Sequence, residues 1–359
     1  MDIINLDKLN LFKKYISSIK KEDNLAIIYD TDMDGITSAV ITSKALDKLN
    51  IKYFQRPRNP KNRTLDKSIQ FFLKENKINK IIFLDLSAES FQDSHLLNNY
   101  DVLVIDHHPI LENYNINFKI IKSFQLQDKL EGYNYCTAHM VFDLFSSILD
   151  LEDLDWVLAC GIIGDVTYDS HIDLLKSIFK KYNLTYNINP YFSDLGQVIE
   201  YSNYALTLGT LEEVNKIYSF FYNSNNYKQV YEKLDYVLPI KKEFEKFISN
   251  FEKNKEVIGD IVFYEIKSKY NLHSLVSTYI SLNLYFGILI CIDIKQNRCF
   301  ISARCQKSKF DLGKMLKECT SNLENAFGGG HPVAAGASIN INDLSKFKEN
   351  VLNWINSNY

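Results

Sequence analysis

Three aspartates stand two residues apart directly after an apolar run in the stretch NLAIIYDTDMDGITS (24–38). They are Asp30, Asp32 and Asp34, and Gly35 follows them. A turn between a strand and a helix, with one aspartate as the helix cap, explains one carboxylate and the glycine but not three carboxylates. Carboxylates gathered at close range repel one another and raise one another's pKa unless cations neutralise them. The spacing therefore predicts a site for cations.

The same spacing also opens the calcium-binding loop of an EF-hand. That loop carries a glutamate at its twelfth position, which binds the ion through two oxygens. Counted from Asp30, the twelfth position is Ile41, and the run before Asp30 has the pattern of a strand and not of a helix. An EF-hand is therefore not expected, and a calcium or metal sensor without enzymatic activity ranks last among the alternatives.

Acidic and imidazole side chains also end three further apolar runs. Asp85 ends KIIFLD, the triplet Asp106, His107 and His108 ends DVLVIDHH, and Asp165 ends WVLACGIIGD. Taken singly, each of these residues is common in turns at the ends of strands and helices. Because neighbouring side chains of a strand point to opposite faces, we expect only one of the two histidines to bind an ion.

The types of these side chains indicate which metal they could bind. Carboxylates and imidazole without thiolates suit Mn²⁺ or Mg²⁺ better than a structural zinc ion. Two such ions, about 3.5–4 Å apart, are the usual device for in-line attack on a phosphodiester. The chemistry that the residues favour is therefore metal-dependent phosphodiester hydrolysis.

The elements around these residues would bring them together. The runs at 25–30, 80–87 and 101–108 are rich in Ile, Val and Leu without alternation, as in strands that are covered on both faces. Helical patterns at 38–49 and 65–76 lie between them, which predicts a parallel sheet. Since the carboxyl ends of parallel strands meet at one edge, the aspartates would project into a common crevice.

Changes of character along the chain predict an α/β protein of three parts. We expect a catalytic domain with the parallel sheet over residues 1–185 and a helical connector over 186–255. Strand and helix patterns then predict a smaller α/β domain over 256–359, which contains a glycine-rich turn, FGGGHP (327–332), before the strand AAGASI. We place the metal cleft between the two α/β domains.

Composition excludes several classes of protein. The 359 residues carry a formal net charge of −3, which argues against a protein that coats nucleic acid through bulk positive charge. The six cysteines are scattered without a CxxC pair, as in a protein of a reducing compartment. No apolar run is long enough to cross a bilayer. We therefore expect a cytoplasmic protein with no membrane partner.

The segment QRPRNPKNR (55–63) concentrates positive charge. Runs of charge with prolines are usually solvated loops, and we interpret this segment in that way. A rim that steers phosphates towards the metal site is the alternative.

Five motifs in fixed order carry a family resemblance. They are DTDMDG (30–35), DLS (85–87), DHH (106–108), GIIGD (161–165) and GGGHPVAAG (328–336). Together they resemble the motifs of the DHH phosphoesterases with a DHH-associated C-terminal domain, over nearly the whole chain outside the connector. The resemblance implies ligands of two metal ions at Asp32, Asp34, Asp85, His107 and Asp165, with Asp85 shared by both ions. It also implies that Asp30 is a ligand or a neighbour of the ligands, that Asp106 orients His107, and that His108 contacts the scissile phosphate.

The glycine-rich segment admits two interpretations from its residues alone. It is a tight turn, or its backbone N–H groups and His331 hold a phosphate or a nucleotide end. The family resemblance implies the second interpretation, with substrate bound by Gly328, Gly329, Gly330 and His331. It also implies that Arg304 grips the nucleic-acid backbone and that Ser302 assists.

The first motif, DxDxDG followed by ITS, resembles that of RecJ-type and archaeal RecJ-like members of the family. This implies a manganese-dependent exonuclease, with Mg²⁺ as the second choice, that degrades single-stranded DNA or RNA from an end into mononucleotides and serves DNA repair. The runner-up is a phosphoesterase for small substrates, namely short oligoribonucleotides, pAp or cyclic dinucleotides. A scaffold in a replication complex, with GINS as partner if the source is archaeal, is a further alternative.

Overall fold

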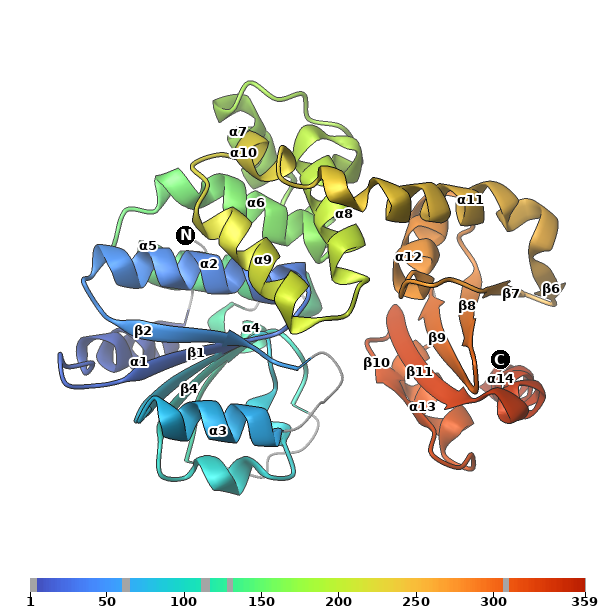
Figure 1. The fold of residues 1–359 in the computed structure, drawn as a ribbon, viewed down its shortest axis with the longest axis horizontal. Coiled ribbons are helices and arrows are strands. Elements are labelled where there is room, and N and C mark those ends of the chain that lie inside the picture. Colours follow the sequence, from blue (N-terminus) through green and yellow to red (C-terminus); the bar gives the residue numbers. More distant parts are fainter. Residues whose placement is uncertain (1–4, 60–64, 111–116, 128–131, 306–309, 359) are drawn as a thin grey trace. The chain divides into compact units, whose positions relative to one another are not determined.

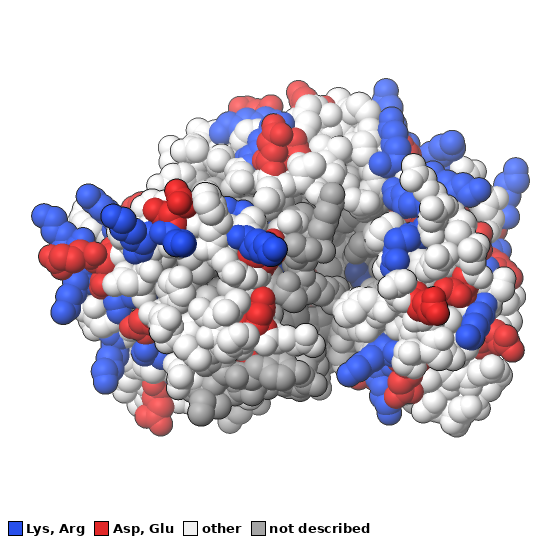
Figure 2. Space-filling view, turned by 60° about the horizontal axis from the view of Figure 1, so that its bottom comes forward, with Lys and Arg blue, Asp and Glu red and all other residues white. Residues whose placement is uncertain are grey.

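The computed structural model describes residues 5–59, 65–110, 117–127, 132–305 and 310–358. The chain divides into two compact units, Met1–Tyr236 and Val237–Tyr359. Among the described residues, no helix is both long and apolar enough to cross a membrane. Acidic and basic side chains are interspersed on the face shown in Figure 2, in line with the small net charge of the sequence.

The first unit is built on a five-stranded parallel sheet of order β2-β1-β3-β4-β5 (Figure 1). Its strands are β1 (Leu25–Tyr29), β2 (Tyr53–Pro57), β3 (Lys80–Leu84), β4 (Asp101–Asp106) and β5 (Lys119–Lys122). Its helices are α1 (Leu6–Ser17), α2 (Met33–Lys48), α3 (Lys67–Glu75), α4 (Ser123–Leu126), α5 (Thr137–Ser146), α6 (Asp155–Gly164), α7 (Ile172–Lys181), α8 (Asp194–Leu206), α9 (Leu211–Tyr222) and α10 (Tyr227–Tyr231). The predicted α/β fold class with a parallel sheet is therefore confirmed, and the three apolar runs form β1, β3 and β4.

Both faces of this sheet are covered, which explains why the central strands carry no polar alternation. α3 packs on one face, where Ile69 and Leu73 join Ile28 and Phe83 of the strands. α2 lies along the opposite face (Figure 1) and is buried on nearly every side, because α5, α6 and α9 pack around it. A helix that is buried all round shows little amphipathic pattern, and α2 illustrates this.

The basic segment at 55–63 differs from the interpretation as a solvated loop. Gln55, Arg56 and Pro57 belong to the edge strand β2, which pairs with β1. Arg58, the next residue, keeps only 14% of its side chain exposed. The positions 60–63 of the motif lie outside the described residues. For 55–58 the loop interpretation is wrong, because pairing with β1 orders these residues.

The second unit contains a six-stranded mixed sheet of order β10-β11-β9-β8-β7-β6, in which only β7 and β8 pair in parallel. Its strands are β6 (Glu256–Ile258), β7 (Ile261–Ile266), β8 (Ile288–Lys295), β9 (Arg298–Arg304), β10 (Phe327–Gly330) and β11 (Ala334–Asn340). Its helices are α11 (Leu238–Asn254), α12 (His273–Asn283), α13 (Leu312–Thr320) and α14 (Leu344–Asn358). The apolar core of this unit lies between the sheet and helices α13 and α14.

The sequence led us to expect a turn over the whole glycine-rich segment, but most of this segment is a strand. Phe327–Gly330 forms the strand β10, which pairs antiparallel with β11 at the edge of the sheet. The glycines allow β10 to lie close to α13, since a Cβ on Gly328 would stand 2.3 Å from the backbone oxygen of Leu316. The turn itself is confined to the residues between β10 and β11.

Candidate metal centre and substrate-binding residues

The acidic residues of the first unit gather where the order of the parallel strands reverses. The chain continues from β1 to β2 on one side and reaches β3 on the other side, so the switch point lies between β1 and β3. Open parallel sheets bind ligands in the crevice at this point, outside the carboxyl ends of the strands. Asp30 follows β1, Asp85 follows β3, and His107 follows β4.

The acidic motif after β1 is shaped by its cap and by its glycine. Asp32 caps α2, because its Oδ1 accepts a hydrogen bond of 3.0 Å from the backbone N–H of Gly35. A Cβ on Gly35 would lie 2.4 Å from the backbone oxygen of Asp30, so no other residue fits here without displacement of the loop. The turn therefore uses Asp32 and the glycine, and Asp30 and Asp34 are left to other contacts.

Asp34 is held by the first turn of α5. Its two carboxylate oxygens accept hydrogen bonds of 2.7 Å from the backbone N–H groups of Thr137 and Ala138. Burial and the charge of Asp32 nevertheless raise the pKa of Asp34 to about 7. The sequence alone does not reveal these hydrogen bonds, because the donors are backbone N–H groups, which almost every residue type has.

Asp85 occupies a strained and buried position. Its φ of 58° lies in the left-handed region, which aspartate tolerates better than most residues with a side chain. Oδ1 accepts a hydrogen bond of 3.1 Å from the hydroxyl of Thr137 and lies 3.5 Å from Nε2 of His107. Burial and the charge of Asp34 raise the pKa of Asp85 well above its usual value.

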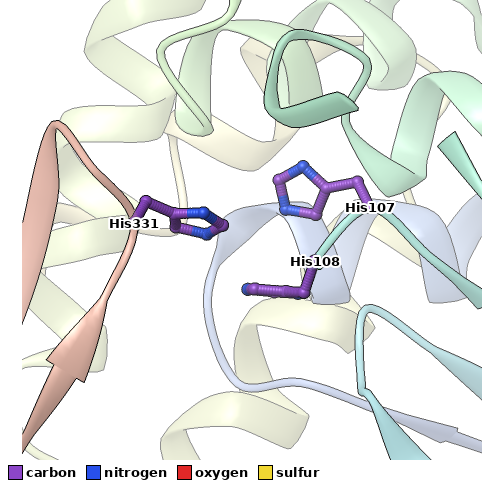
Figure 3. A group of neighbouring side chains, drawn as sticks. All are labelled: His107, His108 and His331. Atoms are coloured by element: carbon purple, nitrogen blue, oxygen red, sulfur yellow. The ribbon is translucent and has the colours of Figure 1, made fainter. Parts of the chain in front are cut away.

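The imidazole of His107 lies among carboxylates. Its Nε2 is 3.9 Å from Oδ2 of Asp34, and its Nδ1 is 3.7 Å from Oδ2 of Asp165, the residue that caps the C-terminal end of α6. His107 and His108 lie side by side on the segment that follows β4 (Figure 3). Their ring centroids are 4.6 Å apart, and their ring planes are inclined at 69°. His107 is buried, and His108 keeps about a third of its side chain exposed.

Several groups of possible ligand atoms lie within 4.8 Å of one another, and two of these groups contain the six predicted ligands. The first group holds Asp34, His107 and Asp165, and the second holds Asp30, Asp32 and Asp85. All six residues that the sequence indicated as ligands are therefore brought together. Among the described residues, Oδ2 of Asp85 and Oδ2 of Asp165 are buried without a hydrogen bond. A bound cation would stabilise the charged form of these buried carboxylates, and the donor set fits divalent ions that prefer oxygen and imidazole.

Asp106 is placed differently from what the sequence led us to expect. Its Oδ1 lies 2.7 Å from Nδ1 of His108, so the imidazole that it contacts most closely is that of His108 and not that of His107. Although burial opposes the charge, His108 and Lys122 hold the pKa of Asp106 well below its usual range. Burial likewise opposes the charge of His108, but Asp106 raises the pKa of His108 to about 9.

Arg58 contacts the acidic motif and was not identified from the sequence as a site residue. Its Nη2 and Nε lie 2.7 and 3.2 Å from Oδ1 of Asp30. The contact follows from the register of β1 and β2, in which Tyr29 pairs with Pro57. Asp30 directly follows Tyr29 and Arg58 directly follows Pro57, so these two residues are neighbours as well. Recognition of YFQRP as a strand beside β1 would have revealed the pair.

The predicted substrate-binding residues of the second unit lie on β9 and β10. Alternation along β9 places Ser302 and Arg304 on the face that α12 covers, since Ile301 and Ala303 face the apolar core. The hydroxyl of Ser302, which is 3% exposed, is 2.8 Å from that of Ser277.

The Arg304 guanidinium is also held by α12. It donates hydrogen bonds of 3.1 Å to the hydroxyls of Ser274 and Thr278, and burial lowers its pKa to about 10. His331 stands in the turn that follows β10 (Figure 3), where its backbone N–H donates a hydrogen bond of 2.8 Å to the oxygen of Ala334. Ala334 in turn pairs with Arg304, so the turn and Arg304 share one end of this sheet.

Comparison with known sequences places two domains on the chain. Residues 24–162 match the model of the DHH family, N-terminal domain, and residues 266–357 match that of the DHHA1 domain. The chain is also 27% identical over 180 residues to the uncharacterised protein MJ0831 of Methanocaldococcus jannaschii. That match covers 48% of this chain and 41% of the relative, which is less than half of the relative's length.

Several solved structures are similar in fold, among them the following three. RecJ in complex with Mn²⁺ from Thermus thermophilus has a TM-score of 0.71 at 13% identity, and the match covers 99% of this chain and 55% of RecJ. An exopolyphosphatase-related protein from Bacteroides fragilis has a TM-score of 0.57 at 15% identity, over 97% of this chain and 96% of that protein. CDC45 from Entamoeba histolytica has a TM-score of 0.54 at 13% identity, over 96% and 98% of the two chains.

Proposed function

Since the chain belongs to the DHH family and also carries a DHHA1 domain, we propose that it is a divalent-metal-dependent phosphodiesterase. The observation that carries this proposal is the pair of ligand groups at the switch point, together with the buried carboxylate oxygens that accept no hydrogen bond among the described residues. A buried carboxylate without a donor is costly, and a bound cation removes that cost.

The roles of the individual residues follow from their contacts. Asp34, His107 and Asp165 would hold one ion, and Asp30, Asp32 and Asp85 the other. Asp85 would also reach the first ion, because its Oδ1 is 3.5 Å from His107. When bound, such a pair of ions supplies a nucleophile from water and stabilises the charge that develops on the phosphoryl oxygens.

His108 would contact the phosphate. Nδ1 of its ring lies 2.7 Å from Oδ1 of Asp106, and the protonated ring has its second hydrogen-bond donor at Nε2. In the metal-free protein Asp106 raises the pKa of His108 to about 9, which favours the cationic imidazole, and a cationic donor hydrogen-bonds to a phosphate oxygen more strongly than a neutral one.

The substrate that we favour is single-stranded nucleic acid, degraded from an end into mononucleotides with Mn²⁺, in DNA repair. Its support is the DxDxDG motif and the likeness of the fold to RecJ, which was solved in complex with Mn²⁺. Arg304, Ser302, His331 and the glycines 328–330 would bind the phosphates of the strand. The three-part division at residues 185 and 255 and the placement of the metal cleft between the α/β domains stay predictions.

Two other functions remain candidates. A phosphoesterase for short oligonucleotides, pAp or cyclic dinucleotides is favoured by the likeness to the exopolyphosphatase-related protein, which this chain matches over nearly the full length of both. A scaffold in a replication complex, with a partner such as GINS, is favoured by the likeness to CDC45. A scaffold would not need the ligand atoms of both groups.

A substrate panel separates these candidates. The purified protein with Mn²⁺ would be incubated with end-labelled single-stranded DNA and RNA of about 30 nucleotides, a dinucleotide, pAp and a cyclic dinucleotide, beside Asp85→Ala. Degradation of the long strands that is lost in Asp85→Ala supports the exonuclease. Turnover of only the small substrates supports the second candidate, and no turnover by the wild type contradicts the enzymatic proposal.

A further inference from the structure

A network of buried charged side chains extends from the interior of the first unit to His108. Its members are Glu89, Lys122 and Asp106, and each of their side chains is 0% exposed. Buried charges are rare in proteins and cost stability unless they are paired. Neither Glu89 nor Lys122 has a role in the metal-dependent hydrolysis proposed above.

Lys122 reaches Asp106 because the two residues pair directly in the parallel register of β4 and β5. Nζ of Lys122 lies 2.5 Å from Oδ2 of Asp106, and the hydroxyl of Ser87 donates a hydrogen bond of 2.7 Å to the same oxygen. Two donors on one oxygen fix the plane of the carboxylate, since rotation would break both contacts.

The other oxygen of Asp106 faces the site. Oδ1 accepts a hydrogen bond of 3.2 Å from the backbone N–H of His108 and lies 2.7 Å from Nδ1 of its ring. The imidazole is therefore oriented by a carboxylate whose far side is clamped by Lys122. Oriented imidazoles in catalytic sites commonly depend on such a carboxylate.

Glu89 completes the network. It stands in a short 3-10 helix (Ala88–Ser90) that follows Asp85, and its Oε1 lies 2.6 Å from Nζ of Lys122. Lys122 thus lies between two carboxylates, and its position is set from both sides. Without Glu89, the flexible side chain of Lys122 could move its ammonium group away from Asp106. The ion pair with Glu89 holds the ammonium group in place.

We propose that Lys122 and Glu89 are positioning residues for His108. They hold the carboxylate of Asp106 in the plane that directs the His108 ring towards the phosphate, and this assignment rests on the role proposed above for His108. An ion network that served only the fold would be replaceable by apolar or neutral groups without any effect on that ring.

The test uses the double variant Glu89→Gln/Lys122→Met, which removes one charge of each sign and leaves Ser87 and His108 on Asp106. The matched control is Lys80→Met, since Lys80 pairs with Asp101 at 2.7 Å at the opposite end of the same sheet, and Asp101 keeps Lys119 as partner. We expect kcat of the double variant to fall about tenfold or more, with KM changed less than about twofold. The control should keep wild-type kcat, and all three proteins should show the same rise of Tm with Mn²⁺.

Imidazole ¹H–¹⁵N spectra, recorded with Mg²⁺, follow the ring directly and do not depend on turnover. The Nδ1–H signal of His108, identified by its loss in His108→Gln, should move or broaden in the double variant and stay in place in Lys80→Met. An unchanged signal, or an unchanged kcat with an altered signal, would overturn the assignment. If the wild type hydrolyses none of the substrates, the proposed function fails, and the spectra still decide whether the network positions the ring.

Discussion

Two sets of polar side chains, one in each unit, are satisfied in opposite ways. At the candidate metal centre of the first unit, carboxylates gather beside the ends of β1 and β3, and the buried Oδ2 atoms of Asp85 and Asp165 accept no hydrogen bond from the described residues. In the second unit, Ser302 and Arg304 are hydrogen-bonded to α12. The first arrangement needs cations when its carboxylates are charged, whereas the hydrogen bonds of the second form without a ligand. The metal centre can therefore be inferred from buried oxygens that lack hydrogen bonds, whereas the predicted substrate-binding residues can only be identified by measurements of binding.

The largest effect is expected from Asp85, because it belongs to the second ligand group and lies closest to His107 of the first. Asp85→Asn should lower kcat/KM by about 10²-fold or more. It should also reduce the rise of Tm that Mn²⁺ produces. Asp173→Asn, on the exposed side of α7, is the control and should match the wild type in both measurements. Wild-type activity in Asp85→Asn would contradict the proposed metal centre.

The acidic loop can be tested through its glycine. Gly35→Ala places a methyl group 2.4 Å from the backbone oxygen of Asp30, so the loop must shift. We expect a loss of about 1–3 kcal/mol in the free energy of unfolding and a weaker response of Tm to Mn²⁺. Denaturant unfolding and thermal scans measure these quantities.

The control for this loop is Gly329→Ala, whose Cβ would meet no atom closer than 3.9 Å. It should unfold with close to the wild-type free energy. Equal stability of Gly35→Ala and Gly329→Ala would show that the acidic loop has room for a side chain at Gly35. That result would contradict the close contact between Gly35 and the backbone of Asp30.

The second unit should affect binding more than the chemical step. Arg304→Ala removes a guanidinium expected on substrate phosphate and should raise KM about tenfold with little change in kcat. Arg298→Ala is a matched control, because Arg298 begins the same strand and binds Ser338 at the opposite end. Steady-state kinetics of both variants would sharpen the comparison between the units. A fall in kcat alone would assign Arg304 to the chemical step.

The smallest effect concerns pH. In the metal-free protein the pKa of Asp34 is raised from 3.8 to about 7, so the stability that its neutral form contributes is lost as pH rises through that interval. Metal binding needs the charged form. The rise of Tm with Mn²⁺ should therefore grow between about pH 5.5 and about pH 8. A rise of Tm that is constant, or larger at low pH, would contradict the raised pKa.

The sequence predicted the centre of the first unit well for a physical reason. Apolar runs marked β1, β3 and β4, and parallel strands end at one edge, so Asp30 and Asp85 could be brought together without coordinates. Asp165 was marked by the end of an apolar run and by the resemblance, but that run forms the helix α6, so no rule for strands places Asp165 beside the others.

Other parts could not be predicted from residue types. β2 and β5 are short edge strands with polar residues, so the contacts that depend on them, Arg58 with Asp30 and Lys122 with Asp106, stayed hidden. The amides of α5 that hold Asp34 have no side-chain signature. The glycines of β10 favour a turn when they are considered by residue type, whereas close packing on α13 requires them in a strand.

The most direct test of the central claim is the anomalous scattering of Mn²⁺ in crystals of the wild-type protein and of Asp85→Asn. Two peaks are expected in the wild type, one at Asp34, His107 and Asp165 and one at Asp30, Asp32 and Asp85. At least one peak should be lost in Asp85→Asn. Wild-type crystals without a peak at either group would contradict a two-ion centre at the switch point of the sheet.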